Sequence, residues 1–247
     1  MIDIAMLVCN RPRITEIAIR ELKARTTTPH RLIVLDNGSE SETLGVLCGL
    51  ANERLIDALI LSERNYGVHW GHNELLNFVS SGPYYVSTDN DLVPCAPTEE
   101  GDWLSRLVDL ANLSPDYAAI ACRPHVLIGE GANLFDDAPE IKERGHVGAH
   151  LRLMFTQATR YAGWDKSARR PSRNNEERWI CKGLKAQGYK VGYARDIRCI
   201  HLFGETELGE DPWGYEQGSE HGHREVSPPV NVFAWDRQGV DWQTCQR

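Results

Sequence analysis

Two aspartates flank one asparagine at positions 89 to 91, directly after an apolar segment that ends at Ser87. Carboxylate oxygens are the preferred ligands of Mg²⁺ and similar hard cations. A bound divalent cation acts as a Lewis acid and neutralises charge that develops on a leaving oxygen. Because side chains alternate along an extended chain, Asp89 and Asp91 are expected to point the same way, with Asn90 opposed. The alternative is an acidic turn after a strand, since Asp and Asn are common turn residues.

Further polar residues follow two other apolar runs. Asn10 and Arg11 come after the first run, and Asp36 comes at the end of the second. Both groups also fit local roles. Pro12 fits the N-terminus of a helix, a role compatible with ligand contact by its neighbours, and Asp36 fits an Asx-turn.

The elements that position these residues alternate along the first half of the chain. Short apolar runs predict strands at residues 2–8, 31–35, 58–61 and 84–87, and apolar stripes at helical spacing predict helices at residues 14–22, 44–50 and 73–79. This order indicates a parallel, doubly wound α/β sheet. Ligands of such sheets bind outside the carboxyl ends of the strands, so the three polar groups are expected to converge on one edge.

The second half is less regular. It predicts a helix at 102–113, a strand at 117–122, a Gly- and Asp-rich loop at 123–145, a helix at 174–187 closed by Gly188, and short strands at 190–193 and 197–201. The loop is long enough to have a function. After residue 203 the chain is polar and punctuated by tryptophans. We therefore expect one domain at residues 1–203 and an irregular tail at residues 204–247.

Composition excludes several classes of protein. The 247 residues are 41% hydrophobic and 25% charged, as in globular proteins, and no run approaches the roughly 18 apolar residues that a membrane span needs. The first apolar run is too short and wrongly flanked for a signal peptide, and the seven cysteines contain no Cys-x-x-Cys pair. A soluble, cytoplasmic protein is expected. The net charge of −8 argues against a partner held by nucleic-acid phosphates, although residues 160–178 form a local basic stretch.

Taken together, these segments resemble the GT-A fold glycosyltransferases, particularly glycosyltransferase family 2. The resemblance covers residues 2–203, and each motif is weak alone, whereas their order and spacing are specific. The motifs are Cys9-Asn10-Arg11-Pro12, Val34-Leu35-Asp36-Asn37-Gly38-Ser39, Asn65-Tyr66-Gly67 with Asn73, Asp89-Asn90-Asp91, Gly163-Trp164-Asp165, Glu176-Glu177 twelve residues before Gly188-Tyr189, and His201.

The resemblance implies a GT-A (Rossmann-like) fold with a mostly parallel central sheet flanked by helices. Residues 1–100 would form the half that binds a nucleotide-diphosphate sugar, and residues 101–203 the half that binds the acceptor. Uridine diphosphate is the commonest donor nucleotide in the family, while guanosine and thymidine diphosphates fit the same pattern. A Mn²⁺ or Mg²⁺ ion would neutralise the pyrophosphate leaving group.

The resemblance also assigns roles to single residues. Those expected to bind the donor are Asn10, Arg11, Asp36, Asn65, Gly67, Asn73, Asp89, Asn90 and Trp164. The expected metal ligands are Asp91 and His201, with Asp89 as a further candidate that is better suited to the sugar or ribose. Without the family, a lone histidine such as His201 is usually structural. His221 and His223 form another conceivable metal pair, but they fit a solvated polar tail better.

An acidic pair at the start of a helix supplies the expected catalytic base. Direct displacement at the anomeric carbon inverts its configuration and needs a carboxylate that takes the acceptor's proton. The resemblance places this group at Glu176 and Glu177, with Glu177 preferred, although the family usually has Asp there. The competing interpretation is a capping box, in which Glu177 bonds back to Asn174 and Glu176 is the base or only complements the helix dipole.

Two other functions remain compatible with the sequence. A binding module that kept the fold and lost the chemistry is one, although the retained Asp91, Glu177 and His201 argue against it. A sugar nucleotidyltransferase is the other, but no Gly-rich triphosphate loop with Lys or Arg follows the first strand. The acceptor has no readable signature, so a saccharide, a glycolipid, a protein side chain and a hydroxylated DNA base all stay open.

Overall fold

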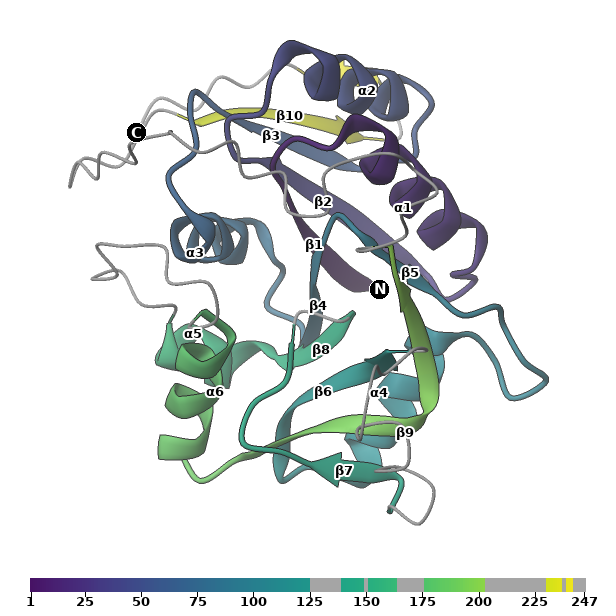
Figure 1. Cartoon of the computed structure of the whole chain (residues 1–247), viewed down its shortest axis with the longest axis vertical. Coiled ribbons are helices and arrows are strands. Elements are labelled where there is room, and N and C mark those ends of the chain that lie inside the picture. Colours follow the sequence, from purple (N-terminus) through teal and green to yellow (C-terminus); the bar gives the residue numbers. More distant parts are fainter. Residues whose placement is uncertain (125–138, 149–150, 164–175, 203–229, 237–238, 242–247) are drawn as a thin grey trace.

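The computed structural model describes residues 1–124, 139–148, 151–163, 176–202, 230–236 and 239–241 (Figure 1). Its strands are β1 (Ile2–Val8), β2 (His30–Asp36), β3 (Ala58–Ser62), β4 (Tyr84–Asp89), β5 (Leu92–Pro94), β6 (Tyr117–Pro124), β7 (Ile141–Glu143), β8 (Arg152–Phe155), β9 (Lys190–His201), β10 (Val230–Asp236) and β11 (Gly239–Asp241). Its helices are α1 (Pro12–Ala24), α2 (Ser41–Asn52), α3 (Val68–Phe78), α4 (Trp103–Leu113), α5 (Thr156–Ala162) and α6 (Glu176–Ala186).

One mixed sheet runs through the molecule in the order β11-β10-β3-β2-β1-β4-β8-β6-β9-β5, with β7 paired to β9. The central strands β3, β2, β1 and β4 are parallel, as predicted. Strand β1 pairs with β2 on one side and with β4 on the other, so the order of the strands reverses at β1. Such a reversal opens a crevice at the carboxyl ends of the two strands, which is where an open α/β sheet binds ligands.

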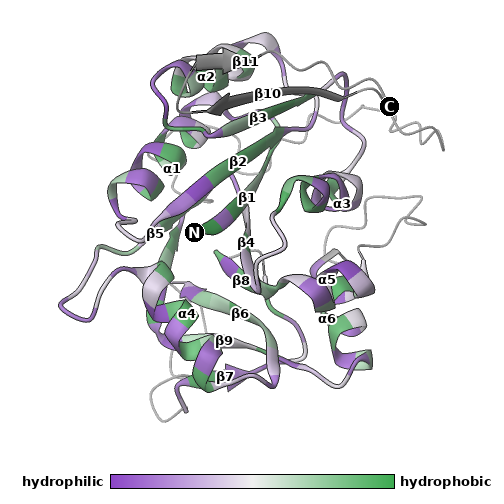
Figure 2. Ribbon diagram, turned by 180° about the vertical axis from the view of Figure 1, so that it is seen from behind, coloured by the Kyte–Doolittle hydropathy of each residue, from purple (hydrophilic) through white to green (hydrophobic). Residues whose placement is uncertain are grey.

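Helices cover both faces of this sheet because its central strands are apolar on both sides (Figure 2). Ile4 and Met6 of β1 belong to a core cluster that also contains buried side chains of α1, α2 and α4. Ala5 and Leu7, which alternate with them, belong to a second cluster with buried side chains of α3, α5 and α6. This alternation has the period of two that an extended strand imposes. The result is three layers, with the sheet between two sets of helices.

Helix α1 begins where the sequence predicts a helix start. Pro12 occupies the first helical position, where its fixed φ fits and its missing N–H leaves no bond unmade. The buried positions Ile14, Ala18 and Leu22 recur every four residues and fix the helix against the sheet.

Helix α4 begins at Asp102, whose side chain is the N-cap and ties the helix to the segment before β2. One carboxylate oxygen accepts hydrogen bonds from the backbone N–H groups of Leu104 and Ser105, each at 2.9 Å. The other accepts from the backbone N–H groups of Thr27 and Thr28, each at 2.6 Å. Burial alone would raise the pKa of Asp102, but these hydrogen bonds lower it to about 2.

Two predicted elements differ from the observed ones. The helix expected from residue 73 begins at Val68, because Gly67 with φ of +89° precedes it and allows an earlier start. The two short strands expected at 190–193 and 197–201 are one strand, β9. Its polar residues Arg195 and Asp196 look like a turn in the sequence. They lie where β9 shifts register against β6 between Ala121 and Arg123, which is a bulge and not a break.

Several elements have no counterpart in the prediction. Strands β5 and β7 have three residues each, which is too short for a periodic signal, and β8 with α5 covers 152–162, where no element was assigned. The region predicted as a tail contributes β10, which pairs antiparallel with β3, and β11, which pairs with β10. No helix in the described residues combines the length and apolar character needed to cross a bilayer.

Candidate functional site

The candidate site lies at the carboxyl ends of β1 and β4, and its centre is Asp91. Strand β4 ends at Asp89, the chain turns at residues 90–91, and β5 begins at Leu92. Asp91 is buried. Its Oδ2 atom accepts a hydrogen bond of 2.9 Å from Nη1 of Arg11 and lies 3.2 Å from Nε2 of His201.

The backbone explains why His201 meets Asp91. Strand β5 pairs antiparallel with β9, and the register places Leu92 opposite His201. The N–H of Leu202 also donates a hydrogen bond of 2.8 Å to the carbonyl oxygen of Asp91. Burial alone would raise the pKa of Asp91, but His201 and Arg11 more than offset this and lower it. The carboxylate of Asp91 therefore stays ionised.

The donor atoms of this pair fit a divalent metal ion. A carboxylate oxygen and an imidazole nitrogen are both ligands that Mn²⁺ accepts, and the two atoms already converge within 3.2 Å. Within the described residues, no cluster of three or more His, Cys, Asp or Glu side chains forms a complete ligand set. Any further ligands of a metal held by Asp91 and His201 would therefore come from outside the described residues, from water or from a bound substrate.

Asp89 and Asp91 have different partners. The expectation that they point the same way assumed an extended segment, whereas residues 90–91 form a turn. The side chain of Asp89 is 39% exposed, and its Oδ1 lies 3.8 Å from Nε2 of the buried His72. Asp89 is thus a separate, partly exposed carboxylate at the end of β4, and its proposed roles stay predictions.

A network of buried polar side chains lies next to Asp89. Arg152, which is fully buried on β8, donates from Nη1 to the carbonyl oxygen of Val147 and from Nη2 to Oγ of Ser87. The hydroxyl oxygen of Ser87 lies 3.5 Å from Nδ1 of His72. Burial, together with the positive charge of Arg152, lowers the pKa of His72 to about 3, so this imidazole is neutral at pH 7.

Asn90 points into the protein. Its Nδ2 donates to Oγ1 of Thr15 at 2.7 Å and to the carbonyl oxygen of Asn10 at 3.2 Å. These bonds join the turn after β4 to the start of α1, so Asn90 fixes the distance between Asp91 and Arg11. Its predicted contact with the donor stays a prediction.

Asn10 and Arg11 both adopt the left-handed conformation, with φ of 58° and 63°. Each such residue other than glycine costs roughly 1 kcal/mol, and Asn tolerates it better than Arg. Asn10 is held by a bond of 2.7 Å from its N–H to Oγ of Ser39 and by a bond of 2.9 Å from the N–H of Glu40 to its Oδ1. The strain is therefore imposed by the neighbouring loop, and it turns the chain so that Arg11 reaches Asp91.

The loops that follow β2 and β3 are fastened by asparagines. Asn37 donates to Oδ1 of Asn65 at 3.0 Å and accepts from the N–H of Tyr66 at 3.0 Å. The same Oδ1 of Asn65 accepts from the N–H of Gly67 at 2.8 Å. Gly38 is required here, because a Cβ on it would lie 2.1 Å from the backbone of Arg64. The predicted residues Asn65 and Gly67 thus help to fix the loops at the carboxyl ends of β2 and β3.

Asp36 is completely buried at the end of β2. Its Oδ2 accepts a hydrogen bond of 3.1 Å from the N–H of Ser39, which is the turn expected as the alternative role. Its Oδ1 has no hydrogen-bond partner among the described residues. Burial raises the pKa of Asp36. A buried carboxylate oxygen without a donor is unusual, and a ligand N–H would satisfy it once the atoms that cover it move.

The remaining predicted residues are less tightly connected to this centre. Asn73 donates a hydrogen bond of 3.0 Å from Nδ2 to the carbonyl oxygen of His69, along its own helix. Glu177 is half-buried in the first turn of α6. Burial and the nearby charge of Glu177 raise the pKa of Tyr193 to about 12, against the effect of a bond from the N–H of Gly148. The side chain of Glu176 and the predicted residues Asn174, Trp164, His221 and His223 lie outside the described residues.

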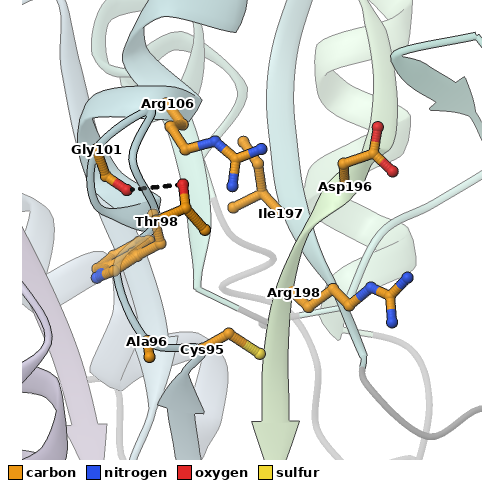
Figure 3. A pocket seen from close by; sticks show the side chains of 9 residues that line it. Cys95, Ala96, Thr98, Gly101, Arg106, Asp196, Ile197 and Arg198 are labelled. Carbon is orange, nitrogen blue, oxygen red and sulfur yellow. Dashed lines mark hydrogen bonds between the residues drawn. The ribbon is translucent and has the colours of Figure 1, made fainter.

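A pocket of about 220 Å³ lies elsewhere, between α4, the end of β5 and the bulge of β9 (Figure 3). Cys95, Arg106 and Arg198 line it together with Asp196. Arg106 forms an ion pair of 2.9 Å with Glu100, and none of the predicted site residues lines the pocket. It is therefore separate from the crevice at Asp91.

The sequence matches the family model described as Glycosyl transferase family 2 over residues 3–170, which is most of the chain. The chain belongs to glycosyl transferase family 2. A comparison with curated protein sequences gave no match.

Several solved structures share the fold of this chain. The mannosyltransferase PcManGT from Pyrobaculum calidifontis, in complex with GDP-Man and Mn²⁺, is 15% identical with a TM-score of 0.66, over 83% of this chain and 57% of that one. TarS of S. aureus, residues 1–349 with UDP-GlcNAc, is 13% identical with a TM-score of 0.59, over 81% and 57%. GalNAc-T7, with UDP, GalNAc and Mn²⁺, is 13% identical with a TM-score of 0.62, over 85% and 45%.

This family 2 chain therefore has the GT-A fold that the sequence predicts, and it spans only about half the length of these three structures. The sequence analysis did not identify His72, Ser87 and Arg152, which form the buried network next to Asp89. It also did not identify Thr15, which accepts a hydrogen bond from Asn90. None of these residues carries a motif. A buried histidine on an apolar helix face and an arginine inside a strand become visible only when the strands are paired.

Proposed function

We propose that this protein transfers a sugar from a nucleotide-diphosphate donor to a hydroxyl group of an acceptor, in a metal-dependent reaction that inverts the anomeric carbon. The observation that carries the proposal is the convergence of Asp91 and His201 at the end of β4, in a chain of family 2. That position is the carboxyl edge of the sheet, at the point where the strand order reverses, and α/β sheets bind nucleotides there.

Asp91 and His201 are the residues that would hold Mn²⁺ or Mg²⁺. The ion, when bound, supplies Lewis-acid stabilisation of the pyrophosphate leaving group. Two of the solved relatives contain Mn²⁺ with a nucleotide, which supports this assignment. Asp91 is suited to the role because its carboxylate is ionised and buried, so a cation there is screened little by water.

The protein's own residues then position the donor. Asp89 has a partly exposed carboxylate at the end of β4, which suits the hydroxyls of the ribose or sugar. Asp36 presents an oxygen without a partner among the described residues, which suits an N–H of the base. Uridine diphosphate is the expected nucleotide, while guanosine and thymidine diphosphates remain candidates. Solved relatives with the same fold contain UDP-GlcNAc in one case and GDP-Man in another.

The acceptor's proton is assigned to a carboxylate of α6, with Glu177 preferred over Glu176. Glu177 lies half-buried in the first turn of α6, the position at which the family resemblance places the base. The acceptor itself stays open among a saccharide, a glycolipid, a protein side chain and a hydroxylated DNA base.

Release of nucleoside diphosphate tests the proposal without knowledge of the acceptor. The full chain is incubated with Mn²⁺ and UDP-, GDP- or dTDP-sugars, and its melting temperature is measured with Mn²⁺ and each nucleoside diphosphate. We expect release of one nucleotide that a chelator abolishes. Saturation at 100 times the dissociation constant should stabilise the fold by about 2.7 kcal/mol, or roughly 5–10 °C.

The outcomes separate the alternatives. A melting shift without any nucleotide release would indicate a binding module of this fold. Release of pyrophosphate from a nucleoside triphosphate and a sugar phosphate would indicate a nucleotidyltransferase. No shift and no release with all three nucleotides would contradict the donor site itself.

A further inference from the structure

Arg11 is bonded to the carboxylate that is predicted to hold the metal ion. Its Nη1 lies 2.9 Å from Oδ2 of Asp91, and the same oxygen is the one that lies 3.2 Å from Nε2 of His201. The Arg11 and Asp91 side chains are only 15% and 11% exposed, so this ion pair is largely shielded from water. The predicted metal ligand is thus already bound to a cation of the protein itself.

A metal ion and Arg11 cannot share this oxygen at low cost. Mn²⁺ and Mg²⁺ bind oxygen at roughly 2.1 Å. With the guanidinium nitrogen at 2.9 Å from the same atom, the two cations would lie no more than about 5 Å apart. Two positive charges at that separation, with little water between them, repel each other strongly. Binding of the metal through Oδ2 therefore favours opening of the ion pair.

The backbone keeps Arg11 near the carboxyl ends of β1 and β4, where the phosphates of a donor are a second partner for its guanidinium. Arg11 is the residue before Pro12 at the start of α1, and its left-handed conformation directs it from the helix end toward the turn after β4. Asn90 and Asn10 tie that turn to the same helix end. The N-terminus of a helix attracts phosphate groups, and a guanidinium binds phosphate oxygens with well-matched geometry, so Arg11 at the start of α1 is placed to bind a diphosphate that reaches this helix end.

We propose that Arg11 couples metal binding to donor binding by leaving the Asp91 carboxylate for the donor's diphosphate. The inference rests on the proposed function and goes beyond it. Arg11 competes with the metal when the donor is absent, and it stabilises the complex when both are bound. Metal and nucleotide then bind with positive cooperativity, and each raises the affinity of the other by the same factor.

Removal of the charge at Arg11 should strengthen the binding of the metal alone and weaken the binding of the nucleotide. In R11M and R11Q, Asp91 loses its internal cation, so Mn²⁺ alone should bind about tenfold more tightly than it binds the wild type. The nucleotide loses a phosphate contact, so its affinity should fall. In the wild type we expect saturating nucleotide to tighten Mn²⁺ binding by about 5- to 150-fold, which is the usual range of coupling between sites. This factor should shrink at least fivefold in both variants.

Manganese titration of the full chain tests the proposal and does not depend on activity. Electron paramagnetic resonance counts free Mn²⁺ in the wild type, R11M and R11Q, alone and with saturating UDP, GDP or dTDP. Arg13 lies two residues further on the exposed side of α1, so R13M is the matched control and should titrate like the wild type. R11Q keeps an amide that can donate to Asp91, which protects against the case in which R11M does not fold.

The results distinguish this inference from the proposed function. If R11M and R11Q bind Mn²⁺ alone no more tightly than the wild type, Arg11 does not compete with the metal and the coupling role is wrong, while the metal site stands. If no protein binds Mn²⁺ with any of the three nucleotides, the metal site fails and the coupling fails with it.

Discussion

Nε2 of His201 lies 3.2 Å from Oδ2 of Asp91, although 110 residues separate them in the chain. The antiparallel pairing of β5 with β9 brings them together, because it sets His201 opposite the residue that follows Asp91. The contact between these side chains is thus a consequence of backbone register, which a single substitution of either side chain leaves intact. Site variants at these two positions are therefore informative about chemistry.

Substitution of Asp91 by asparagine should abolish metal-dependent transfer while the fold persists. Loss of groups that merely support a metal ligand typically costs 10- to 100-fold, so loss of a direct ligand should cost more than about 100-fold. The amide keeps the shape of the side chain but leaves Arg11 without a carboxylate, which should lower stability by about 1 kcal/mol or roughly 2–4 °C. Turnover, Mn²⁺ binding and the melting temperature check this.

The control for this prediction is H201A, which removes the neighbouring imidazole and keeps the carboxylate. Its loss should be smaller, on the order of tenfold. Wild-type turnover in D91N, or turnover in the wild type that a chelator leaves unchanged, would contradict the assignment of Asp91 to a metal.

The convergence of the site was predictable because it depends on strand ends. A parallel sheet brings the residues after β1, β2 and β4 to one edge whatever the details of the loops. The directions of individual side chains were not predictable, because they depend on turns. Asn90 points toward Thr15 because the chain turns at residues 90–91, and sequence alone does not distinguish that turn from an extended Asp-x-Asp segment.

Substitution of Asp102 should destabilise the fold without affecting the site. Its carboxylate caps α4 and binds the backbone of Thr27 and Thr28. Loss of an N-cap costs up to about 2 kcal/mol, so D102A should melt roughly 4–8 °C lower than the wild type. Asp109 lies exposed on the same helix, and D109A is the matched control with no expected change. Thermal melts at pH 7 measure both.

The carboxylate of Asp102 also makes the stability of the fold depend on pH. Its pKa is about 2 in the folded protein and about 3.9 in an unfolded chain, so the unfolded state binds the proton first as the pH falls. The stability that Asp102 supplies is therefore complete above pH 4 and is lost between about pH 4 and pH 2. The denaturant concentrations at the unfolding midpoints of the wild type and D102A should therefore become equal as the pH falls through that range. A constant difference down to the lowest pH at which the wild type folds would contradict the role of the charge.

The elements that the sequence missed share a physical cause. Strands β5 and β8 are stabilised by partners distant in sequence, β9 for the first and β4 with β6 for the second. Short strands of this kind carry little local signal, because their pairing contributes more than their own propensity. The network of His72, Ser87 and Arg152 joins α3, β4 and β8, so it depends on the pairing of the missed strand β8 with β4. A polar group buried inside a sheet stays invisible in the sequence until its partners are known.

The last prediction distinguishes a catalytic from a structural role for Glu177. Loss of a general base should reduce turnover by roughly 10²- to 10⁴-fold with little change in nucleotide affinity, whereas loss of a helix cap should cost about 1 kcal/mol and spare turnover. E177Q keeps the size of the side chain and removes its charge, and E176Q is the neighbouring control. We expect E177Q to lose turnover while it binds Mn²⁺ and nucleotide normally, and E176Q to change little.

The two alternatives give opposite patterns. Normal turnover in E177Q with an earlier melt would assign Glu177 to the cap, and a loss confined to E176Q would move the base by one residue. The anomeric configuration of the product provides an independent check, because a single displacement assisted by a base inverts that centre. A product that keeps the donor's configuration would exclude the single displacement, whichever glutamate the variants identify.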